Sequence, residues 1–260
     1  MNTLFFYLSL LKTSIKASVS NRVAFLIETG LMIANNLIFV AIWWIFFLEF
    51  QDVAGWNFTD MALLVAIGSG GYGLMQVCFG GTRTLSHMIV GGDLDPFMTQ
   101  PKNLLLHIAG SKSFAKGWGH LMTAAIMLPI GGIAELSSIL LAIVGVVCGG
   151  LIFTAVNIVA NCMPFWVGPV EGVVKKYCDA VYLFALYPTH IYSGFLQIVM
   201  FTLIPAGVIG FLPVDLIRTF SWIKLLILIG SSLAFFAIAS AVFYAGLRRY
   251  ESGNQFGLRS

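Results

Sequence analysis

Residues 136–163 read LSSILLAIVGVVCGGLIFTAVNIVANCM, a stretch without a single charged side chain. A bilayer core about 30 Å thick is crossed by roughly 20 apolar residues in a helix, so this stretch predicts a transmembrane helix. The other runs that are almost free of charge are residues 23–48, 61–79, 121–133, 180–212 and 223–247. Since 59% of the chain is hydrophobic and 10% is charged, we expect an all-α polytopic membrane protein with six transmembrane helices.

The basic residues are unevenly divided between the two sides of the expected membrane. With the N-terminus placed inside, the outer segments hold only Arg218 and Lys224. The inner segments hold Lys12, Lys16, Arg22, Arg83, Lys102, Lys112, Lys116, Lys175, Lys176, Arg248, Arg249 and Arg259. Because basic residues are retained on the cytoplasmic side, we expect a multi-pass protein of the cell inner (plasma) membrane with both termini in the cytoplasm.

The N-terminal segment, residues 1–22, has a pattern different from a crossing. Leu4, Leu8, Leu11 and Ile15 recur at helical spacing, and Lys12 falls elsewhere around the helix. This pattern predicts an amphipathic helix over residues 3–20 that lies in the inner membrane interface. The alternative is a longer first crossing with an irregular start.

The inner loop of residues 80–116 is the longest polar stretch. Within it, the sequence from Gly91 to Pro96 predicts a turn followed by a short helix, with Asp93 or Asp95 as its N-cap and Pro96 in its first turn. Pro101 and Asn103 then open the approach to the third crossing. We interpret this loop as a docking element.

The fifth apolar region is too long for one simple span. Tyr187-Pro188 interrupts it, since proline removes a backbone donor and disfavours helix in the residue before it. We expect a crossing from about Lys176, or from Glu171, to Leu186, and then a broken or re-entrant outer segment over residues 188–213 with a second apolar helix at 191–204. Irregular backbone at membrane depth lines a cavity or is buried in protein, so Tyr187 and Pro188 are candidates for a translocation path or gate. A kink with consequences for packing alone is the alternative.

Polar residues within the crossings are few. Glu28 and Asn35 lie in the first expected crossing and Asn157 in the fourth. Such groups either bond across helices or contact a polar substrate, so these three residues are further candidates for the translocation path. Glu28 lies close enough to the inner interface to pair with Arg22 or to reach water.

Motifs for enzymatic chemistry are missing from the sequence. The histidines and cysteines do not follow a metal-ligand spacing, and neither a G-x-S-x-G nor an H-E-x-x-H motif occurs. Residues 110–113, Gly-Ser-Lys-Ser, look like the end of a P-loop, but Leu106 stands where the first glycine belongs. We therefore expect no catalytic residue, metal or cofactor in this chain, and any nucleotide would be bound by a partner.

Three motifs resemble a subgroup of ABC-2 type transporter permeases. Gly92-Asp93-Leu94-Asp95 with Pro101 and Leu104 is similar to the G-x-L-D…P…L motif of the first inner loop in that subgroup. Tyr187-Pro188…Ile191-Tyr192, followed by Ile204-Pro205 and Leu212-Pro213, resembles its fifth-span region, and residues 246–253 resemble its cytoplasmic tail. The likeness runs over the full length of the chain.

The resemblance implies an ABC-2 type permease fold, with residues 1–260 as a single transmembrane permease domain. It implies a second permease, identical or homologous, and cytoplasmic ABC ATPase subunits that bind ATP and Mg. The short coupling helix would transmit the ATPase movement through Asp93, Leu94, Asp95, Pro96, Phe97 and Pro101. The expected function is export of a hydrophobic or amphiphilic small molecule or lipid, with membrane lipids and no nucleic acid as further partners. The alternative is a membrane scaffold or assembly protein that transports nothing.

Overall fold

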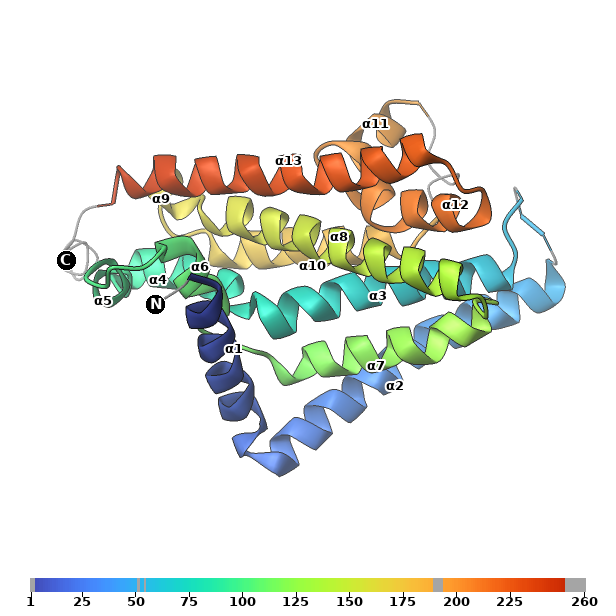
Figure 1. Ribbon diagram of the computed structural model, residues 1–260, viewed down its shortest axis with the longest axis horizontal. Helices are drawn as coiled ribbons and strands as arrows, with labels where there is room; N and C mark the ends of the chain where they lie inside the picture. Colours follow the sequence, from blue (N-terminus) through green and yellow to red (C-terminus); the bar gives the residue numbers. More distant parts are fainter. Residues whose placement is uncertain (1–2, 51, 54, 189–193, 251–260) are drawn as a thin grey trace.

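The computed structural model describes residues 3–50, 52–53, 55–188 and 194–250. Its long helices lie along one common direction, and successive ones run in opposite senses (Figure 1). They are α2 (Arg22–Glu49), α3 (Phe58–Cys78), α7 (Ala115–Ile130), α8 (Leu136–Asn161), α10 (Glu171–Ala185) and α13 (Trp222–Leu247). Apart from an isolated β-bridge between Val53 and Trp56, the described part of the chain has no sheet, and the all-α prediction is confirmed.

Four segments are long and apolar enough to cross a membrane. They are α2, α3, α13 and residues 136–167, which combine α8 with the short helix α9 (Pro164–Val167). Helices α7 and α10 have 16 and 15 residues. At 1.5 Å per residue they extend about 24 Å and 22 Å, less than the roughly 30 Å core of a bilayer. Four of the six predicted crossings are therefore present as candidate spans by length and composition.

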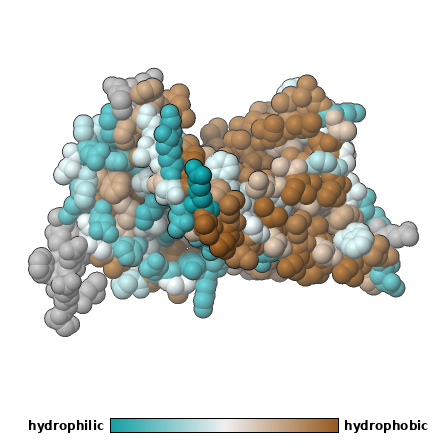
Figure 2. Space-filling view, turned by 90° about the horizontal axis from the view of Figure 1, so that it is seen from below, coloured by the Kyte–Doolittle hydropathy of each residue, from teal (hydrophilic) through white to brown (hydrophobic). Residues whose placement is uncertain are grey.

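Helix α3 forms the centre of the bundle. Of its most apolar stretch 89% is buried, compared with 17% for α2 and for α13. The outward faces of these two helices are apolar, and Figure 2 shows a broad hydrophobic surface with the hydrophilic residues gathered toward the two ends. Since lipid tails are as apolar as leucine, such a surface suits contact with lipid.

Glycines allow α3 to approach its neighbours closely. A Cβ on Gly71 would lie 3.0 Å from the backbone nitrogen of Gly150 in α8, and a Cβ on Gly73 would lie 2.7 Å from the carbonyl oxygen of Gly117 in α7. Small residues at such positions let helix backbones pack against each other in a membrane. The close approach holds α3 directly against α7 and α8.

Helix α1 (Thr3–Ser20) runs across the bundle instead of along it (Figure 1). Asn21 separates it from α2, and the Asn21 side chain caps α2 by accepting from the backbone nitrogen of Ala24. The hydroxyl of Tyr7 donates to the carbonyl oxygen of Cys78 at 2.8 Å, which fixes α1 at the C-terminal end of α3. The structure thus has a separate transverse helix over the residues for which the interfacial helix was predicted, and its place in the membrane interface stays a prediction.

Short helices fill the end of the molecule at which α3 and α13 finish, which we call the inner end after the predicted orientation; the opposite end is called the outer end. They are η1 (Gly80–Thr84), α4 (Leu85–Gly91), α5 (Asp95–Met98) and α6 (Leu104–Gly110). Gly92 ends α4 in the left-handed conformation with φ 76°. The predicted short helix is present as α5 with Pro96 in its first turn, but its predicted cap is wrong. Leu94 holds the N-cap position without a side-chain hydrogen bond, and the carboxylate of Asp95 bonds elsewhere.

The outer end contains the predicted break after the fifth helix. Helix α10 begins at Glu171 and ends at Ala185, one residue before Tyr187-Pro188. The described outer elements are α11 (Phe195–Phe201), the π-helical turn η3 (Gly207–Phe211) and α12 (Leu212–Arg218). Helix α11 is shorter than the helix predicted at 191–204, and residues 189–193 lie outside the described residues.

An ion pair ties this outer end to the start of α3. Arg218 at the end of α12 pairs with Asp60 and donates to the carbonyl oxygen of Gly55 at 3.1 Å. The Arg218 guanidinium also lies 4.7 Å from the ring centroid of Trp56. Asp60 in turn completes a capping box with Asn57, so one carboxylate serves both the cap and the ion pair.

Candidate functional site

Two stacked tyrosines stand at the centre of a polar cluster inside the bundle. The ring of Tyr72 in α3 lies on that of Tyr182 in α10, with centroids 4.2 Å apart and an interplanar angle of 16°. The ring of His120 from α7 meets both edge-on, at 5.2 Å from Tyr72 and 5.0 Å from Tyr182. Phe153 of α8 packs 5.1 Å from Tyr72, so four helices converge here.

Hydrogen bonds join this aromatic group to α2. The Tyr182 hydroxyl lies 3.2 Å from His120 Nδ1 and donates to Asn36 Oδ1 at 3.4 Å. Asn36 Nδ2 lies 3.1 Å from His120 Nδ1 and donates to Thr123 Oγ1 at 3.0 Å. Because an amide nitrogen can only donate, His120 Nδ1 accepts and the ring carries its proton on Nε2. These buried polar groups therefore satisfy one another.

A charged pair extends the cluster toward the inner end. Arg83, in η1, donates from Nη1 to the Tyr72 hydroxyl at 2.6 Å, and its Nη2 lies 3.8 Å from Asp179 Oδ1 in α10. The Tyr72 hydroxyl donates to the same Asp179 oxygen at 3.3 Å. The Asp179 side chain is 52% exposed, whereas that of Arg83 is 21% exposed. The cluster thus begins at an accessible carboxylate and ends at buried amides.

Helix α10 has one polar and one apolar face. Its buried face, which packs toward α8, consists of Val174, Cys178, Val181 and Ala185. Glu171, Lys175 and Asp179 follow each other at four-residue spacing and are exposed. Charged side chains within membrane proteins face the bundle interior or a water-filled cavity because burial in lipid is costly. This face therefore needs water or another protein surface beside it.

A cavity of about 170 Å³ lies between this face and the inner end of α8. It is lined by Arg83, Asn157, Glu171 and Lys175, together with Asn161 and Cys178. Asn157 is 2% exposed and bonds from Nδ2 to the carbonyl oxygen of Phe153. Of the residues predicted to lie on the path, Asn157 is thus the one that the structure brings to the charged cluster.

The remaining predicted path residues lie elsewhere. Glu28 and Asn35 are exposed on the face of α2 that points away from the bundle. Among the described residues, no ion pair joins Glu28 to Arg22. The ring of Tyr187 packs edge-on against Phe39 of α2, with centroids 5.7 Å apart, and Pro188 is buried. Tyr187 and Pro188 thus sit where the break meets α2, away from the charged cluster.

Most members of the cluster were not predicted as site residues from the sequence. Asn36 was visible as the neighbour of Asn35, and the spacing of Glu171, Lys175 and Asp179 could have identified one polar face of α10. His120 and Tyr182 offer no such local signal, because only the packing of α7 against α3 and α10 brings them together.

The predicted coupling residues form a second site at the inner end. Leu94 is fully buried in an apolar cluster with residues of α4, α6, α8 and α13, while Asp93 and Pro96 are exposed. Asp93 lies 3.7 Å from His87 Nδ1, and Asp95 accepts a hydrogen bond from the Tyr250 hydroxyl at 3.0 Å. Burial and the bond to Asp95 raise the pKa of Tyr250 to about 12, so this hydroxyl is a neutral donor at physiological pH.

Phe97 links this second site to α1 through two ring contacts. Its centroid lies 4.7 Å from that of His107 in α6, and His107 meets Phe6 of α1 edge-on at 5.3 Å. Burial lowers the pKa of His107, whose Nδ1 has no hydrogen-bond partner within the described chain. Pro101 lies on the same side, in a pocket shared with Thr3 and Phe6. All six predicted coupling residues therefore lie at the inner end, and Leu94 and Phe97 face the core.

No group of three or more His, Cys, Asp or Glu side chains in the described ranges could hold a metal ion. A family model described as ABC-2 family transporter protein matches residues 12–254 of the chain. No curated protein matches the chain.

Proposed function

Since the chain belongs to the ABC-2 family of transporter membrane proteins, we propose that it is the permease subunit of an ATP-driven exporter, with ATP and Mg bound by cytoplasmic partner ATPases. A second permease, identical or homologous, completes the membrane part. The cargo is a hydrophobic or amphiphilic small molecule or lipid. The protein lies in the cell inner membrane with both termini in the cytoplasm.

This proposal includes six crossings, with α7 and α10 as the two shorter ones. Both run beside candidate spans, α7 against α2 and α3, and α10 against α8. The segment that follows α10 turns back as α11, η3 and α12 before α13 begins. A short α10 and the re-entrant outer segment that follows it would together span the bilayer. The irregular backbone between them would be surrounded by protein, because lipid cannot satisfy its polar groups.

The observation that carries the proposal is the charged face of α10. Glu171, Lys175 and Asp179 are exposed in the single chain on a helix that packs within the membrane bundle. Asp179 lies one turn beyond Lys175, a residue of the predicted inner segment, so this face leads from the cytoplasmic side into the bundle. A translocation path needs such a wet surface, whereas a scaffold does not. The path would run from Lys175 past Asp179 and Arg83 to the tyrosine stack.

The cargo class is supported by the surfaces next to this face. An apolar groove of about 370 Å³ lies between the inner end of α8 and α10, lined mainly by valines together with Met163 and Tyr177. The contact of Ala160 with Val174 and Cys178 separates this groove from the charged cavity. A polar and an apolar surface on one helix suit an amphiphilic cargo, which has both polar and apolar groups.

Coupling to the ATPase is assigned to α5 and its flanks. Met98 is 47% exposed there, whereas Leu94 is buried. Leu94 therefore anchors this segment in the core, and Met98 is an apolar side chain that can contact a partner. Movement of α5 would reach α8 and α13 through the Leu94 cluster and α1 through Phe97 and His107. Replacing residues 93–97 as a block would remove the buried Leu94, so tests of docking should change exposed residues alone.

Thiol labelling tests whether the charged face of α10 is wet. Asp179→Cys and Leu183→Cys would each be made in a variant whose native cysteines are alanine, and probed with a membrane-impermeant maleimide in inside-out vesicles. Leu183 is the matched control, because it is 47% exposed and lies one turn beyond Asp179, where the stripe of Glu171, Lys175 and Asp179 ends in an apolar side chain. We expect labelling at position 179 and protection at position 183. Protection of both positions in a correctly folded protein would contradict the proposed path.

A further inference from the structure

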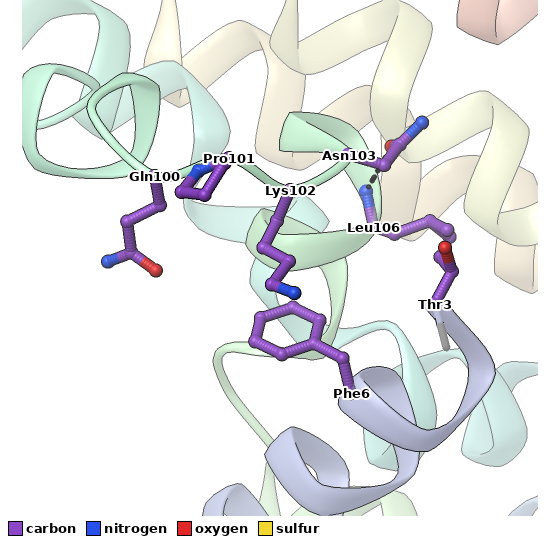
Figure 3. Close-up of a pocket in the computed structure, with 7 residues that line it drawn as sticks. All are labelled: Thr3, Phe6, Gln100, Pro101, Lys102, Asn103 and Leu106. Atoms are coloured by element: carbon purple, nitrogen blue, oxygen red, sulfur yellow. Dashed lines mark hydrogen bonds between the residues drawn. The ribbon is translucent and has the colours of Figure 1, made fainter. Parts of the chain in front are cut away.

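A pocket between α1 and residues 100–106 has no role in the function proposed above. It has a volume of about 280 Å³ and is lined by Thr3 and Phe6 of α1 and by Gln100, Lys102 and Asn103, of which Lys102 points toward Phe6 (Figure 3). This volume falls just below the roughly 300–1,000 Å³ of sites for drug-sized ligands. It therefore suits a headgroup better than a whole substrate.

The polar groups of this pocket are mainly donors. Lys102 offers three N–H groups, and Figure 3 shows its side chain over the Phe6 ring, with Nζ 5.2 Å from the ring centroid. Asn103 Oδ1 already accepts from the Leu106 nitrogen at 3.0 Å and from the Tyr244 hydroxyl at 3.3 Å, so it is an occupied acceptor, and Figure 3 shows the Asn103 side chain directed away from Phe6 and Lys102. Thr3 and Gln100 supply a hydroxyl and an amide. None of the lining residues is acidic, so the pocket favours an anion.

The Lys102 ammonium is not neutralised within the described chain. The ion pairs and hydrogen bonds between described residues do not involve it, and its contact is the Phe6 ring. A cation held over an aromatic ring is stabilised in place without losing its charge. It is therefore available to an external anion.

The position of the pocket identifies the source of that anion. Helix α1 runs across the bundle at the inner end of α3, and its Leu4, Phe5 and Leu8 side chains are 64%, 62% and 54% exposed. These residues are immediate neighbours of Thr3 and Phe6, so an apolar surface borders the donor pocket. A molecule with a phosphate and acyl chains matches both surfaces, and anionic lipids are attracted to basic residues at the cytoplasmic leaflet.

We propose that this pocket binds the phosphate of an anionic inner-leaflet phospholipid through Lys102, with the acyl chains against the exposed apolar face of α1. Because Phe6 touches both Lys102 and His107, and His107 touches Phe97, the bound lipid lies two ring contacts from α5. The site would thus connect the lipid of the membrane to the segment proposed for ATPase docking.

Native mass spectrometry of the full-length chain in detergent tests the site, with phosphatidylglycerol as the probe and phosphatidylcholine as the neutral lipid. One interfacial basic residue contributes about five-fold in affinity for anionic lipid, so Lys102→Gln should weaken phosphatidylglycerol binding by about that factor. Lys102→Arg should restore it, because it keeps the cation. Lys116→Gln, an exposed lysine outside the pocket, should leave it within about two-fold.

Several results would overturn this assignment, and none depends on transport or on an ATPase. Equal effects of Lys102→Gln and Lys116→Gln would mean general electrostatic attraction and no site. Displacement of phosphatidylglycerol by millimolar inorganic phosphate would assign the pocket to free phosphate. Unchanged lipid binding in Lys102→Gln, with loss of a co-purifying subunit, would assign it to an acidic partner segment. Loss of binding in Lys102→Arg would show that packing and not charge matters.

Discussion

The Tyr250 hydroxyl donates a hydrogen bond to Asp95 Oδ1 at 3.0 Å, which joins the end of the last span to the short helix α5. The Tyr250 ring also packs 6.3 Å from Phe165 of α9, and the neighbouring Arg249 guanidinium lies 6.0 Å from the Trp166 ring. The chain that leaves α13 therefore holds the expected coupling segment from the side opposite α1. The tail from Glu251 onward lies outside the described residues.

Removing this hydroxyl should loosen α5. A hydrogen bond of this kind contributes about 1 kcal/mol, which corresponds to roughly five-fold in a local opening equilibrium. We expect Tyr250→Phe to accelerate amide exchange in residues 95–98 by about that factor. Tyr177→Phe is the control, because that hydroxyl bonds to the carbonyl oxygen of Leu203, far from α5. Equal exchange in Tyr250→Phe and the parent protein would show that the bond does not hold α5.

The same bond sets a pH dependence. Since the pKa of Tyr250 is raised to about 12, its stabilising contribution is complete below the unfolded value of 10.0 and is lost as the pH rises through about 12. Protection of α5 against exchange, corrected for intrinsic rates, should therefore be constant from pH 7 to pH 9.

The Tyr182 hydroxyl should be important for the stability of the bundle. It contacts Ser69, His120 and Asn36, and its removal leaves buried polar groups with fewer partners. Leaving a buried group unsatisfied costs about 1–3 kcal/mol, so Tyr182→Phe should lower the thermal unfolding midpoint in detergent. Tyr187→Phe is the matched control, because Tyr187 makes ring contacts but no hydroxyl bond within the described residues. Equal midpoints for the two variants would contradict the network.

Close packing of α3 against α7 predicts a steep cost at Gly73. A Cβ there would lie 2.7 Å from the Gly117 carbonyl oxygen and 2.9 Å from the Leu121 nitrogen, both backbone atoms. Overpacking typically costs about 1–3 kcal/mol, so Gly73→Ala should destabilise the protein. Gly230→Ala in α13 meets no atom within 4 Å and should be neutral or slightly stabilising. The thermal unfolding midpoints of the two variants are compared in the same detergent. An unchanged midpoint for Gly73→Ala would contradict the close packing of α3 against α7.

His107 should make the inner end sensitive to acid. Burial lowers its pKa below 6.5, so its contribution to stability is complete above pH 6.5 and declines as the pH falls from there toward the folded value. Phenylalanine keeps the ring contacts without a titrating group. We expect the parent protein to lose stability relative to His107→Phe between pH 7 and pH 5. Parallel pH profiles of the unfolding midpoints would show that the ring does not titrate in this way.

Local pattern predicted most of the fold and little of the polar cluster. Runs of apolar residues located α2, α3, α8 and α13, and the proline at 188 located the end of α10, because these features depend on neighbours in sequence. The cap of α5 was wrong because α5 begins at Asp95 itself, with Leu94 in the N-cap position, and the Asp95 carboxylate bonds to Tyr250, a residue distant in the chain.

The choice between Asn35 and Asn36 shows the limit most clearly. Both are asparagines in one apolar helix, yet one step of about 100° around the axis separates an exposed side chain from one that is 3% exposed and bonded to α7. Hydropathy does not determine which face of α2 meets α7. That depends on the glycines of α3 and α7, which allow the helices to approach.

The central claim is that this membrane subunit works with a separate cytoplasmic ATPase that docks on α5. The direct test is affinity purification of the tagged chain in mild detergent, comparing the parent protein with Met98→Glu. Losing a buried apolar contact of this size corresponds to roughly ten-fold in affinity. Lys112→Glu, an exposed change elsewhere in the same inner loop, is the control.

We predict that an ATP-hydrolysing subunit co-purifies with the parent protein and with Lys112→Glu, and is strongly depleted with Met98→Glu. The contrary result is a folded chain that purifies without any ATPase from an extract in which another ABC transporter remains intact.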